Sequence, residues 1–498
     1  MERMKALALV TLLTVCAGGA HAQADDTALF STLVAPNVML LVDNSGSMTH
    51  MVWHPSFDPT ATPTCGAWSN GSTYWYNSNF TTTQCGKNLT VYVDPVVAGG
   101  WVRYSGRYLN WLFSPESNAF NTDIQSANNG TYSSCVGGGT YPKYRRTRVT
   151  AAKDVLREVV CQVNAAGAVR FGMAQFRRPG ANSNTDGGYV RVPANDFLDA
   201  SQNPNVYTLN GNTQAHGDHI DDAIDELTGE SWTPLAETLF QVYTYFMSRT
   251  SADIPNGANL PLTKFPKYSF TTSRTAGNGG PFSTAGAPTV PESPVQWECQ
   301  KNFVLIITDG EPTKDNFNNA DGDPEELGFG NFNTLIGDYN PDGENEFLGS
   351  DGTRYLDDIA MFMHNIDFRP DLPGDQTLDV YTVGFTTSPT ANGILQKTAN
   401  VGGGQFYFST SAEQLAQDIV AVLTDIIRKS HTFTASAVPA TRTADGGMFY
   451  TSSFIPERDS GYWTGSLRAW KMLANGDILG QGDVCALDDP DVGECNSG

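Results

Sequence analysis

Short runs of consecutive apolar residues alternate along most of the chain with segments in which apolar residues recur at helical spacing. The apolar runs have the length of strands and lack polar alternation, which is typical of strands buried on both faces of a sheet. These runs lie at 38–42, 169–176, 303–307 and 380–385. The helical stripes lie at 148–163, 235–246, 356–366 and 415–426. Their order predicts a doubly wound, mostly parallel α/β sheet in a domain of about residues 30–430.

Long polar stretches separate these elements, far beyond the usual connections of about 2–6 residues. We predict four inserts, at about 50–140, 178–230, 250–298 and 312–352. The first contains an aromatic cluster, which we interpret as a small core held by cysteines rather than as a ligand platform. Its members are Trp68, Tyr74, Trp75, Tyr76, Phe80, Trp101, Tyr104, Tyr108 and Trp111.

From residue 431 to residue 498 the pattern changes to short strands separated by Gly, Asn-Gly and Pro, which is typical of an all-β region. The predicted strands lie at 432–438, 448–455, 466–472 and around Ile478. The stretch is too short to close into a sandwich, barrel or propeller, so we expect it to be the incomplete beginning of one.

The first 22 residues have the pattern of a secretory signal peptide. Arg3 and Lys5 precede an apolar run at 6–15, and Ala20 and Ala22 supply small residues for cleavage. The run is too short to span about 30 Å of hydrocarbon. We therefore expect an exported protein, and no later apolar stretch predicts a membrane span.

The composition of the chain limits which partners it can bind and in which compartment it acts. The 498 residues include 53 acidic and 30 basic side chains, for a formal net charge of −23. Such a surface repels phosphate backbones, which argues against nucleic-acid binding. Seven cysteines follow the signal segment and suggest disulfides in an oxidising compartment. The close pairs Cys65/Cys85 and Cys485/Cys495 are natural partners, but the spacing leaves the connectivity open and one cysteine over.

Oxygen-bearing side chains follow two of the predicted strands and precede one predicted helix. Asp43, Ser45 and Ser47 follow the first strand, Asp309 follows the strand at 303–307, and Thr233 lies just before a helix. Ligands of open α/β sheets bind beyond the carboxyl ends of the strands. Hard oxygen ligands suit Mg²⁺ or Ca²⁺. We predict that these five residues hold one divalent cation; a helix-capping role for the two serines is the alternative.

Three motifs in this order resemble those of a von Willebrand factor A domain. They are Asp43-x-Ser45-x-Ser47, Thr233-Pro234 and Thr308-Asp309-Gly310. The resemblance implies a metal-ion-dependent adhesion site, whose vacant coordination position accepts a carboxylate from a partner. Thr233 lies much farther from Asp43 than a compact domain of this type needs, and the inserts account for the distance.

Finer matches resemble the PilC/PilY family of type IV pilus tip-associated proteins. They lie at 231–239, 293–303, 308–312, 355–370 and 399–407, and the segment 462–470 resembles the entry to that family's β-propeller. The resemblance implies an exported pilus biogenesis factor and adhesin at the pilus tip or outer membrane. Its partners would be minor pilins and a surface or host receptor.

Two further groups of residues are candidate ligands. Asp338, Asn340 and Asp342, with Glu344 and Glu346, match the first half of a calcium loop, although position twelve is Gly349 rather than Glu. A second Ca²⁺ site and a solvated acidic loop are equally compatible with this pattern. The pairs His50/His54 and His216/His219 lack a third ligand at known spacing, so we interpret them as polar surface residues.

Three functions are compatible with these patterns. We favour the metal-dependent pilus adhesin. A secreted A-domain protein unrelated to pili is the alternative, and neighbouring minor-pilin genes would separate the two. A metal-dependent hydrolase is less favoured because no general base accompanies the predicted ligands, and we expect that the chain is not an enzyme.

Overall fold

The structure is a computed structural model that divides into two units, one of Ala35–Ser430 and a second that includes the strands after residue 430. The description covers 34–95, 100–132, 139–164, 169–176, 187–199, 201–209, 212–247, 293–298, 300–315, 336, 338–343, 354–369, 372 and 374–430. It also covers the strand backbones at 438–439, 448–456, 463–472 and 478–479. The predicted signal peptide lies outside these residues.

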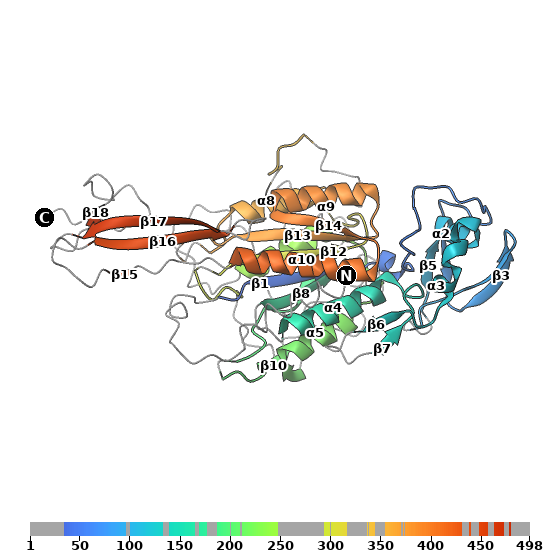
Figure 1. The fold of residues 1–498 in the computed structure, drawn as a ribbon, viewed down its shortest axis with the longest axis horizontal. Coiled ribbons are helices and arrows are strands. Elements are labelled where there is room, and N and C mark those ends of the chain that lie inside the picture. The colour runs from blue at the N-terminus through green and yellow to red at the C-terminus, as the bar shows by residue number, and fades with distance from the viewer. Residues whose placement is uncertain are drawn as a thin grey trace. The chain divides into compact units, whose positions relative to one another are not determined.

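A six-stranded sheet forms the centre of the larger unit (Figure 1). Its order is β14 (Gly403–Ser409), β13 (Leu378–Phe385), β12 (Asn302–Thr308), β1 (Asn37–Val42), β8 (Arg170–Phe176) and β9 (Gly188–Val192). All neighbouring strands are parallel except β9, which runs antiparallel to β8. The mostly parallel α/β sheet predicted from the apolar runs is therefore confirmed.

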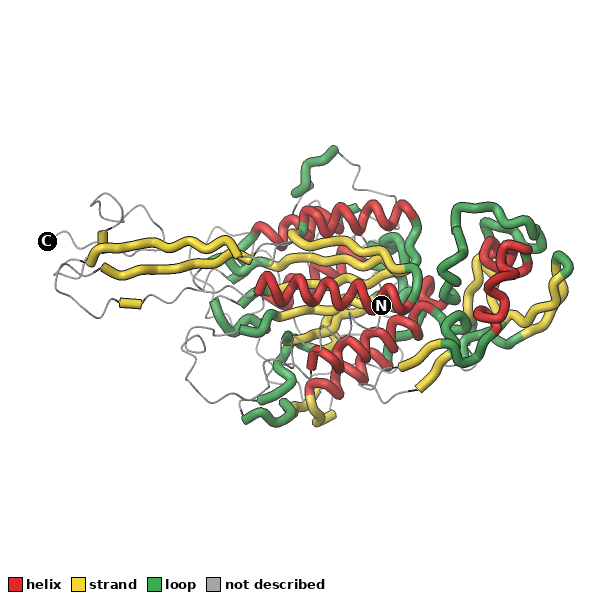
Figure 2. The backbone as a smooth tube through the Cα atoms, in the orientation of Figure 1, coloured by secondary structure: helices red, strands yellow, loops and turns green. Residues whose placement is uncertain are grey.

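Helices cover both faces of this sheet, as Figure 2 shows in red. One face packs against α4 (Arg148–Asn164), α5 (His216–Asp225) and α10 (Ala412–Ser430). The other packs against α6 (Leu235–Met247), α8 (Leu356–Asn365) and α9 (Pro389–Val401). Every residue of β1 is buried because it lies between these two layers, which explains its unbroken apolar sequence.

Several elements of this fold lie where the sequence pattern indicated an insert or gave no clear signal. The stretch 178–230, predicted as an insert, contains β9, the hairpin β10 (Val206–Leu209) with β11 (Asn212–Ala215), and α5. Strand β9 is entirely buried, but Gly188 and Arg191 interrupt its apolar pattern; Arg191 is neutralised by Glu226, with Nε 2.7 Å from Oε2. The pair α9 and β14, rich in Gly, Thr and Asn, also gave no clear signal.

The first insert folds as a subdomain with its own core. Its two-stranded antiparallel sheets pair β2 (Thr73–Tyr76) with β5 (Val102–Ser105), β3 (Phe80–Gln84) with β4 (Lys87–Val91), and β6 (Gly130–Tyr132) with β7 (Gly139–Tyr141). Its helical segments are α2 (Gly106–Phe113), η4 (Pro115–Phe120) and α3 (Asn121–Gln125). We call residues 50–147 the insert subdomain.

The core of the insert subdomain contains seven of the nine predicted aromatic residues. Tyr104, Tyr108 and Trp111 are buried in it, with Trp68, Tyr74, Tyr76 and Phe80 packed against them. The Cys65–Cys85 disulfide joins two parts of this subdomain, so the pairing that the close spacing suggested but left open is present. Trp75 and Trp101 remain exposed, so they do not contribute to the core.

The second unit contains a four-stranded antiparallel sheet of order β15 (Val438–Pro439), β16 (Met448–Pro456), β17 (Trp463–Met472) and β18 (Ile478–Leu479). Its strands fall close to the predicted ones. That they begin a propeller stays a prediction, and Cys485 and Cys495 lie outside the described residues.

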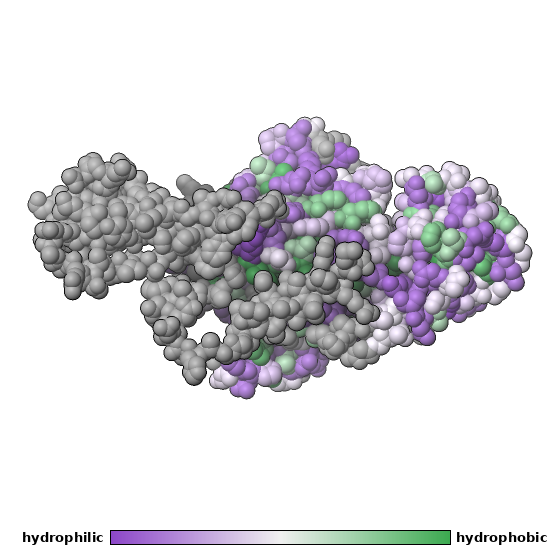
Figure 3. All heavy atoms as spheres, in the orientation of Figure 1, coloured by the Kyte–Doolittle hydropathy of each residue, from purple (hydrophilic) through white to green (hydrophobic). Residues whose placement is uncertain are grey.

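Polar residues cover much of the described surface on the face in Figure 3, and hydrophobic residues there form small patches. Within the described part of the chain, no helix combines the length and apolar character needed to cross a bilayer.

Candidate metal centre

The candidate site lies where the strand order of the main sheet reverses. The chain passes from β1 to β8 on one side and later returns to place β12 on the other side of β1. Val42 and Ile307 are register partners, so the loops that begin at Asp43 and at Asp309 lie at the same edge of the sheet. Such a switch point leaves a crevice at the carboxyl ends of the strands, the usual ligand site of this architecture.

The first loop directs its polar groups to this crevice through local hydrogen bonds. The Ser45 amide donates to Asp43 Oδ1 over 2.7 Å, and Ser45 Oγ lies 2.7 Å from Ser47 Oγ. Asn44 exchanges two hydrogen bonds with the Phe176 backbone at the end of β8, which anchors the loop to the sheet. Ser47 lies in the short helix η3 (Gly46–Thr49), and Ser45 makes no side-chain cap bond to that helix.

Thr233 is joined to the loop after β12 across a large sequence separation. Its amide donates to Thr313 Oγ1 over 3.1 Å, and the Thr313 amide donates to the Thr233 carbonyl over 3.0 Å. The Asp315 carboxylate accepts hydrogen bonds from the Ala236 and Glu237 amides at the start of α6. Asp315 therefore caps α6, the helix that begins two residues after Thr233.

Asp309 is held on the other side of the crevice by a buried ion pair. Arg148, the first residue of α4, donates from Nη1 to Asp309 Oδ2 over 2.7 Å, and both side chains are buried. Asp309 Oδ1 is buried without a hydrogen-bond partner. One carboxylate oxygen is thus neutralised, whereas the other is available to a ligand.

The backbone of Asp309 lies beside the Asp43 carboxylate, and the charge of Asp309 acts on that carboxylate. The Asp309 amide lies 3.4 Å from Asp43 Oδ2, which also accepts a 2.5 Å hydrogen bond from Thr308 Oγ1. Burial raises the pKa of Asp43 to about 7, and the charge of Asp309 acts in the same direction. A cation between the carboxylates would remove this repulsion.

Gly310 leaves space between the two remaining hydroxyl groups. A Cβ at this position would lie 3.5 Å from Ser47 Oγ and 3.9 Å from Thr233 Oγ1. Gly46, Ser47 and Gly310 are partly exposed, whereas Asp43 and Asp309 are buried. Among the five predicted ligands, Ser47 is therefore the partly exposed one, since Ser45 and Thr233 are buried like the two carboxylates.

The donor set fits a hard divalent cation. All five predicted ligands lie at one edge of the sheet, and the predicted alternative of two serines capping a helix accounts for neither Thr233 nor Asp309. No group of three or more His, Cys, Asp or Glu suited to a metal exists among the described residues. The candidate set contains two carboxylates and three hydroxyls, so it differs from sites of that type.

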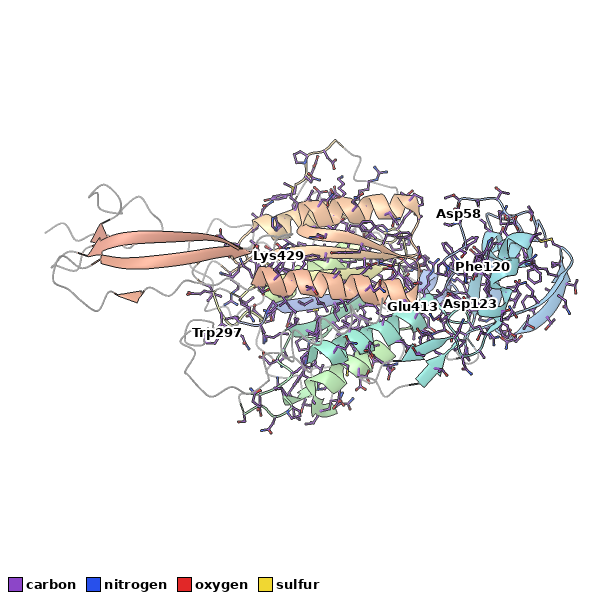
Figure 4. All side chains as sticks on the ribbon, viewed as in Figure 1. Asp58, Phe120, Asp123, Trp297, Glu413 and Lys429 are labelled. Atoms are coloured by element: carbon purple, nitrogen blue, oxygen red, sulfur yellow. A yellow bond between two sulfur atoms is a disulfide. The ribbon has the colours of Figure 1, made fainter. Side chains whose placement is uncertain are left out.

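The insert subdomain borders the candidate site. The His50 and Arg103 backbones form a parallel bridge, and the Arg148 amide donates to the His50 carbonyl. Burial lowers the pKa of His50 to about 4, and the charge of Arg148 acts in the same direction. Lys143 Nζ lies 2.6 Å from the Glu413 carboxylate at the start of α10, which ties the other end of the subdomain to the main helices. Figure 4 shows Glu413 beside the subdomain residues Phe120 and Asp123.

The predicted second calcium loop lies against the start of α8. The Asn340 amide donates to Asp358 Oδ1 over 2.7 Å, and Lys397 pairs with the carboxylates of Asp342 and Asp357. The ammonium group already compensates part of the negative charge there. Glu344 and Glu346 lie outside the described residues, so the second calcium site stays a prediction.

The histidines predicted to be on the surface are mostly buried. His216 is fully buried, with Nε2 2.9 Å from the Phe171 carbonyl and Nδ1 2.9 Å from the Tyr207 hydroxyl. His219 Nε2 lies 3.0 Å from the Tyr207 carbonyl. His54 is also buried, and its Nε2 lies 3.2 Å from Asp123. The surface interpretation was wrong for His54, His216 and His219, because their rings find hydrogen-bond partners within the fold.

Three residues near the site were not predicted. Thr308 bonds Asp43, Arg148 bonds Asp309, and Asp315 caps α6. Thr308 directly precedes Asp309 at the end of an apolar strand, and that position alone indicated it. The other two act across long sequence separations, which leave no local pattern.

No family model matches the chain, and no curated protein matches it. Two solved structures of the PilB minor pilin from Streptococcus sanguinis are similar to it over 80% of this chain. An alanine mutant of that pilin matches at 10% identity with a TM-score of 0.31, and the unmutated pilin at 11% with the same TM-score. The matches span 62% and 63% of the pilin chains, under two thirds of their length. Similarity at this level carries no argument about function.

Proposed function

We propose that this chain is a metal-dependent binding protein of the von Willebrand factor A type. Asp43, Ser45, Ser47, Thr233 and Asp309 would hold Mg²⁺ or Ca²⁺, and a partner carboxylate would complete the coordination. The observation that carries this proposal is the unpartnered Oδ1 of Asp309, buried at the same sheet edge as Asp43.

The chemistry of the donors supports a cation better than a structural role. Two buried carboxylates in a low-dielectric environment repel each other, and the fold supplies one guanidinium, from Arg148, in direct contact with Asp309 alone. Oxygen ligands of this kind suit hard divalent ions. Gly310 keeps the space between the hydroxyl groups of Ser47 and Thr233 free.

Each element of the fold has a defined part in binding. Hydrogen bonds from Ser45 and Thr308 orient the Asp43 carboxylate, and Arg148 orients that of Asp309. Thr313 fixes the backbone of Thr233. The cation would supply positive charge, which lets an acidic group approach a protein of net charge −23.

We further propose that the protein is exported and acts in type IV pilus biogenesis and adhesion, with minor pilins and a surface or host receptor as partners. This part rests on the sequence segments that resemble the PilC/PilY family. Generic metal-dependent protein binding outside pili is the alternative. We propose no enzymatic activity, because the residues around the site offer oxygen ligands and guanidinium groups rather than a general base.

The metal site is tested by thermal unfolding of the whole chain with and without Mg²⁺ or Ca²⁺. Saturation at about 100 times the dissociation constant should stabilise the wild type by about 2.7 kcal/mol. Asp43→Asn keeps the side-chain shape and should lose this stabilisation. Asp58→Asn, at an exposed position of the insert subdomain, is the matched control. Equal ion-induced shifts in both variants would refute the site.

The pilus role is tested in the organism that encodes the chain. Deletion should reduce piliation or attachment, and Asp43→Asn should reduce attachment. Normal pili and adhesion in the deletion strain would refute the pilus role and leave the metal site standing.

A further inference from the structure

Arg103 extends from β5 of the insert subdomain to the first loop of the candidate metal site. Its Nη2 lies 2.5 Å from the position that a Cβ would take at Gly46, the residue between Ser45 and Ser47. The backbone bridge to His50 and the hydrogen bond from the Met51 amide to the Arg103 carbonyl fix β5 beside this loop. The guanidinium therefore lies against the same loop that supplies three of the predicted ligands.

Arg103, like Arg107 and Arg145 of the same subdomain, has no carboxylate in hydrogen-bond contact among the described residues. Arg148, Arg170 and Arg191 each pair with an acidic side chain. The Arg103 guanidinium instead lies on the Trp75 ring, with Cζ 4.0 Å from the ring centroid, and its Nε is buried without a hydrogen-bond partner. Arg103 is therefore a half-buried guanidinium that lies against the loop of the predicted ligands with no carboxylate bonded to it, in a chain with 53 acidic residues.

The negative charge of Asp309 acts on Arg103, and a bound cation would neutralise that charge. Burial lowers the pKa of Arg103, and Asp309 opposes this effect. Once Asp309 coordinates a cation, its charge no longer stabilises Arg103. A second anion would then be favoured beside the guanidinium.

Two exposed tryptophans belong to the same region. Trp75, under the guanidinium, is 48% exposed, and Trp232, between Ser231 and Thr233, is 40% exposed. The Gly46 amide donates to the Ser231 carbonyl over 2.8 Å, so Trp232 adjoins the first loop. Tryptophan and arginine are the residues that most often dominate binding energy at protein interfaces. Side chains of the kinds that bind proteins therefore lie beside the predicted ion site.

We propose that Arg103, held over Trp75, is the second anchor for the partner, which is a protein segment with two acidic side chains. One carboxylate coordinates the ion, and the other accepts hydrogen bonds from the Arg103 guanidinium. This inference rests on the proposed metal site and specifies the partner that the site selects. The two positive centres together overcome the repulsion between an acidic segment and the acidic protein.

The test measures binding of the full chain to two peptides tethered at high density on a biosensor surface in saturating Mg²⁺. One peptide carries a single glutamate among glycines, and the other carries a second glutamate two residues away. The wild type should bind the diacid peptide about tenfold more tightly than the monoacid peptide. Arg103→Gln should remove this preference while retaining the Mg²⁺-induced thermal shift. Trp75→Ala should reduce the preference for the diacid peptide about threefold.

The controls separate the inference from the proposed function. Arg107→Gln alters a guanidinium of the same subdomain that donates to the Thr60 and Ala61 carbonyls, and should keep the preference. Trp297→Ala alters an exposed tryptophan at the opposite end of the sheet in Figure 4, and should also keep it. Equal binding of both peptides by the wild type, or a preference that survives in Arg103→Gln, overturns the inference while the metal site stands. A wild type without a Mg²⁺-induced shift overturns both.

Discussion

The two ends of the central strands both carry buried polar side chains, but they differ in how donors and acceptors are balanced. At the amino end, Asn37 donates to Asn302 Oδ1 over 2.9 Å, and Arg170 donates to Asn37 Oδ1 and to the Pro294 carbonyl. At the carboxyl end, Asp43 and Asp309 are both buried, and a single guanidinium contacts one of them. At the first end the acceptors receive donors and the one guanidinium pairs with Asp196, whereas at the second end acidic groups are in excess.

This difference separates a structural network from a binding site. A buried network whose members are mutually bonded fixes the strands and needs nothing from outside. A cluster with excess acceptors and an unpartnered carboxylate oxygen gains free energy from an added cation. Substitutions at the amino end should therefore act on stability regardless of ions, and substitutions at the carboxyl end should act through ions.

The largest effect is expected from Arg170→Met. The change leaves the buried Asn37 side chain and the Pro294 carbonyl without their donor, so the free energy of unfolding should fall by about 3 kcal/mol. Urea denaturation should give the same loss with and without Mg²⁺. Arg157→Met, at a partly exposed ion pair, should cost less than about 1 kcal/mol. Recovery of the Arg170→Met variant by Mg²⁺ would contradict the distinction between the ends.

Arg148→Met should have a slightly smaller effect, and one that depends on ions. Without Arg148, the buried Asp309 charge is uncompensated, so the metal-free chain should lose about 2–3 kcal/mol. A divalent cation replaces the missing charge, so Mg²⁺ should stabilise this variant more than the wild type. The measurement is urea denaturation at several Mg²⁺ concentrations, and an unchanged or smaller Mg²⁺ effect would count against the site.

His216 makes the amino end sensitive to acid. Burial lowers its pKa to about 3, so the folded chain excludes a proton that the unfolded chain takes up below about pH 6.5. Stability is full above that pH and declines as the pH falls toward 3. Between pH 7 and pH 5, the free energy of unfolding of the wild type should fall by about 2 kcal/mol more than that of His216→Gln. His364→Gln, whose side chain is 39% exposed, should keep the wild-type pH dependence.

Gly310→Ala should have the smallest effect, and this effect should be confined to the affinity for the ion. The added methyl group would lie 3.5 Å from Ser47 Oγ and occupy the space between the hydroxyl groups. Mg²⁺ affinity, measured by titration calorimetry, should fall about tenfold, equivalent to about 1.4 kcal/mol. The metal-free stability should change by less than about 0.5 kcal/mol. Undiminished affinity would show that the ion does not use this space.

Much of the larger unit was predictable because its strands are buried on both faces. The strands at 38–42 and 303–307 carry unbroken apolar sequences, so both their positions and the polar residues that follow them could be identified. Strand β9 could not, because Arg191 lies buried in it and is compensated by Glu226 from a distant segment. The pattern of apolar residues in a sequence indicates which apolar groups are buried, but it does not indicate buried charges that a distant residue compensates.

The same limit applies to the candidate site. Asp43, Ser45 and Ser47 share one loop, so their spacing carries a signal. Arg148 contacts Asp309 across 161 positions of sequence, and Arg103 reaches Gly46 from a separate subdomain. The groups that compensate or extend the site come from elements whose proximity depends on the fold. Their positions therefore required the structure.

The clasp between Thr233 and Thr313, with Asp315 at the start of α6, bears on how this protein can be engineered. These contacts set the position of Thr233 from the loop after β12, so the chain that leaves α6 after Met247 does not determine it. The connection from Met247 to Ser293 can then change in length with little effect on the ligand geometry. A reporter or an affinity tag inserted there would label the protein while leaving its ion chemistry intact.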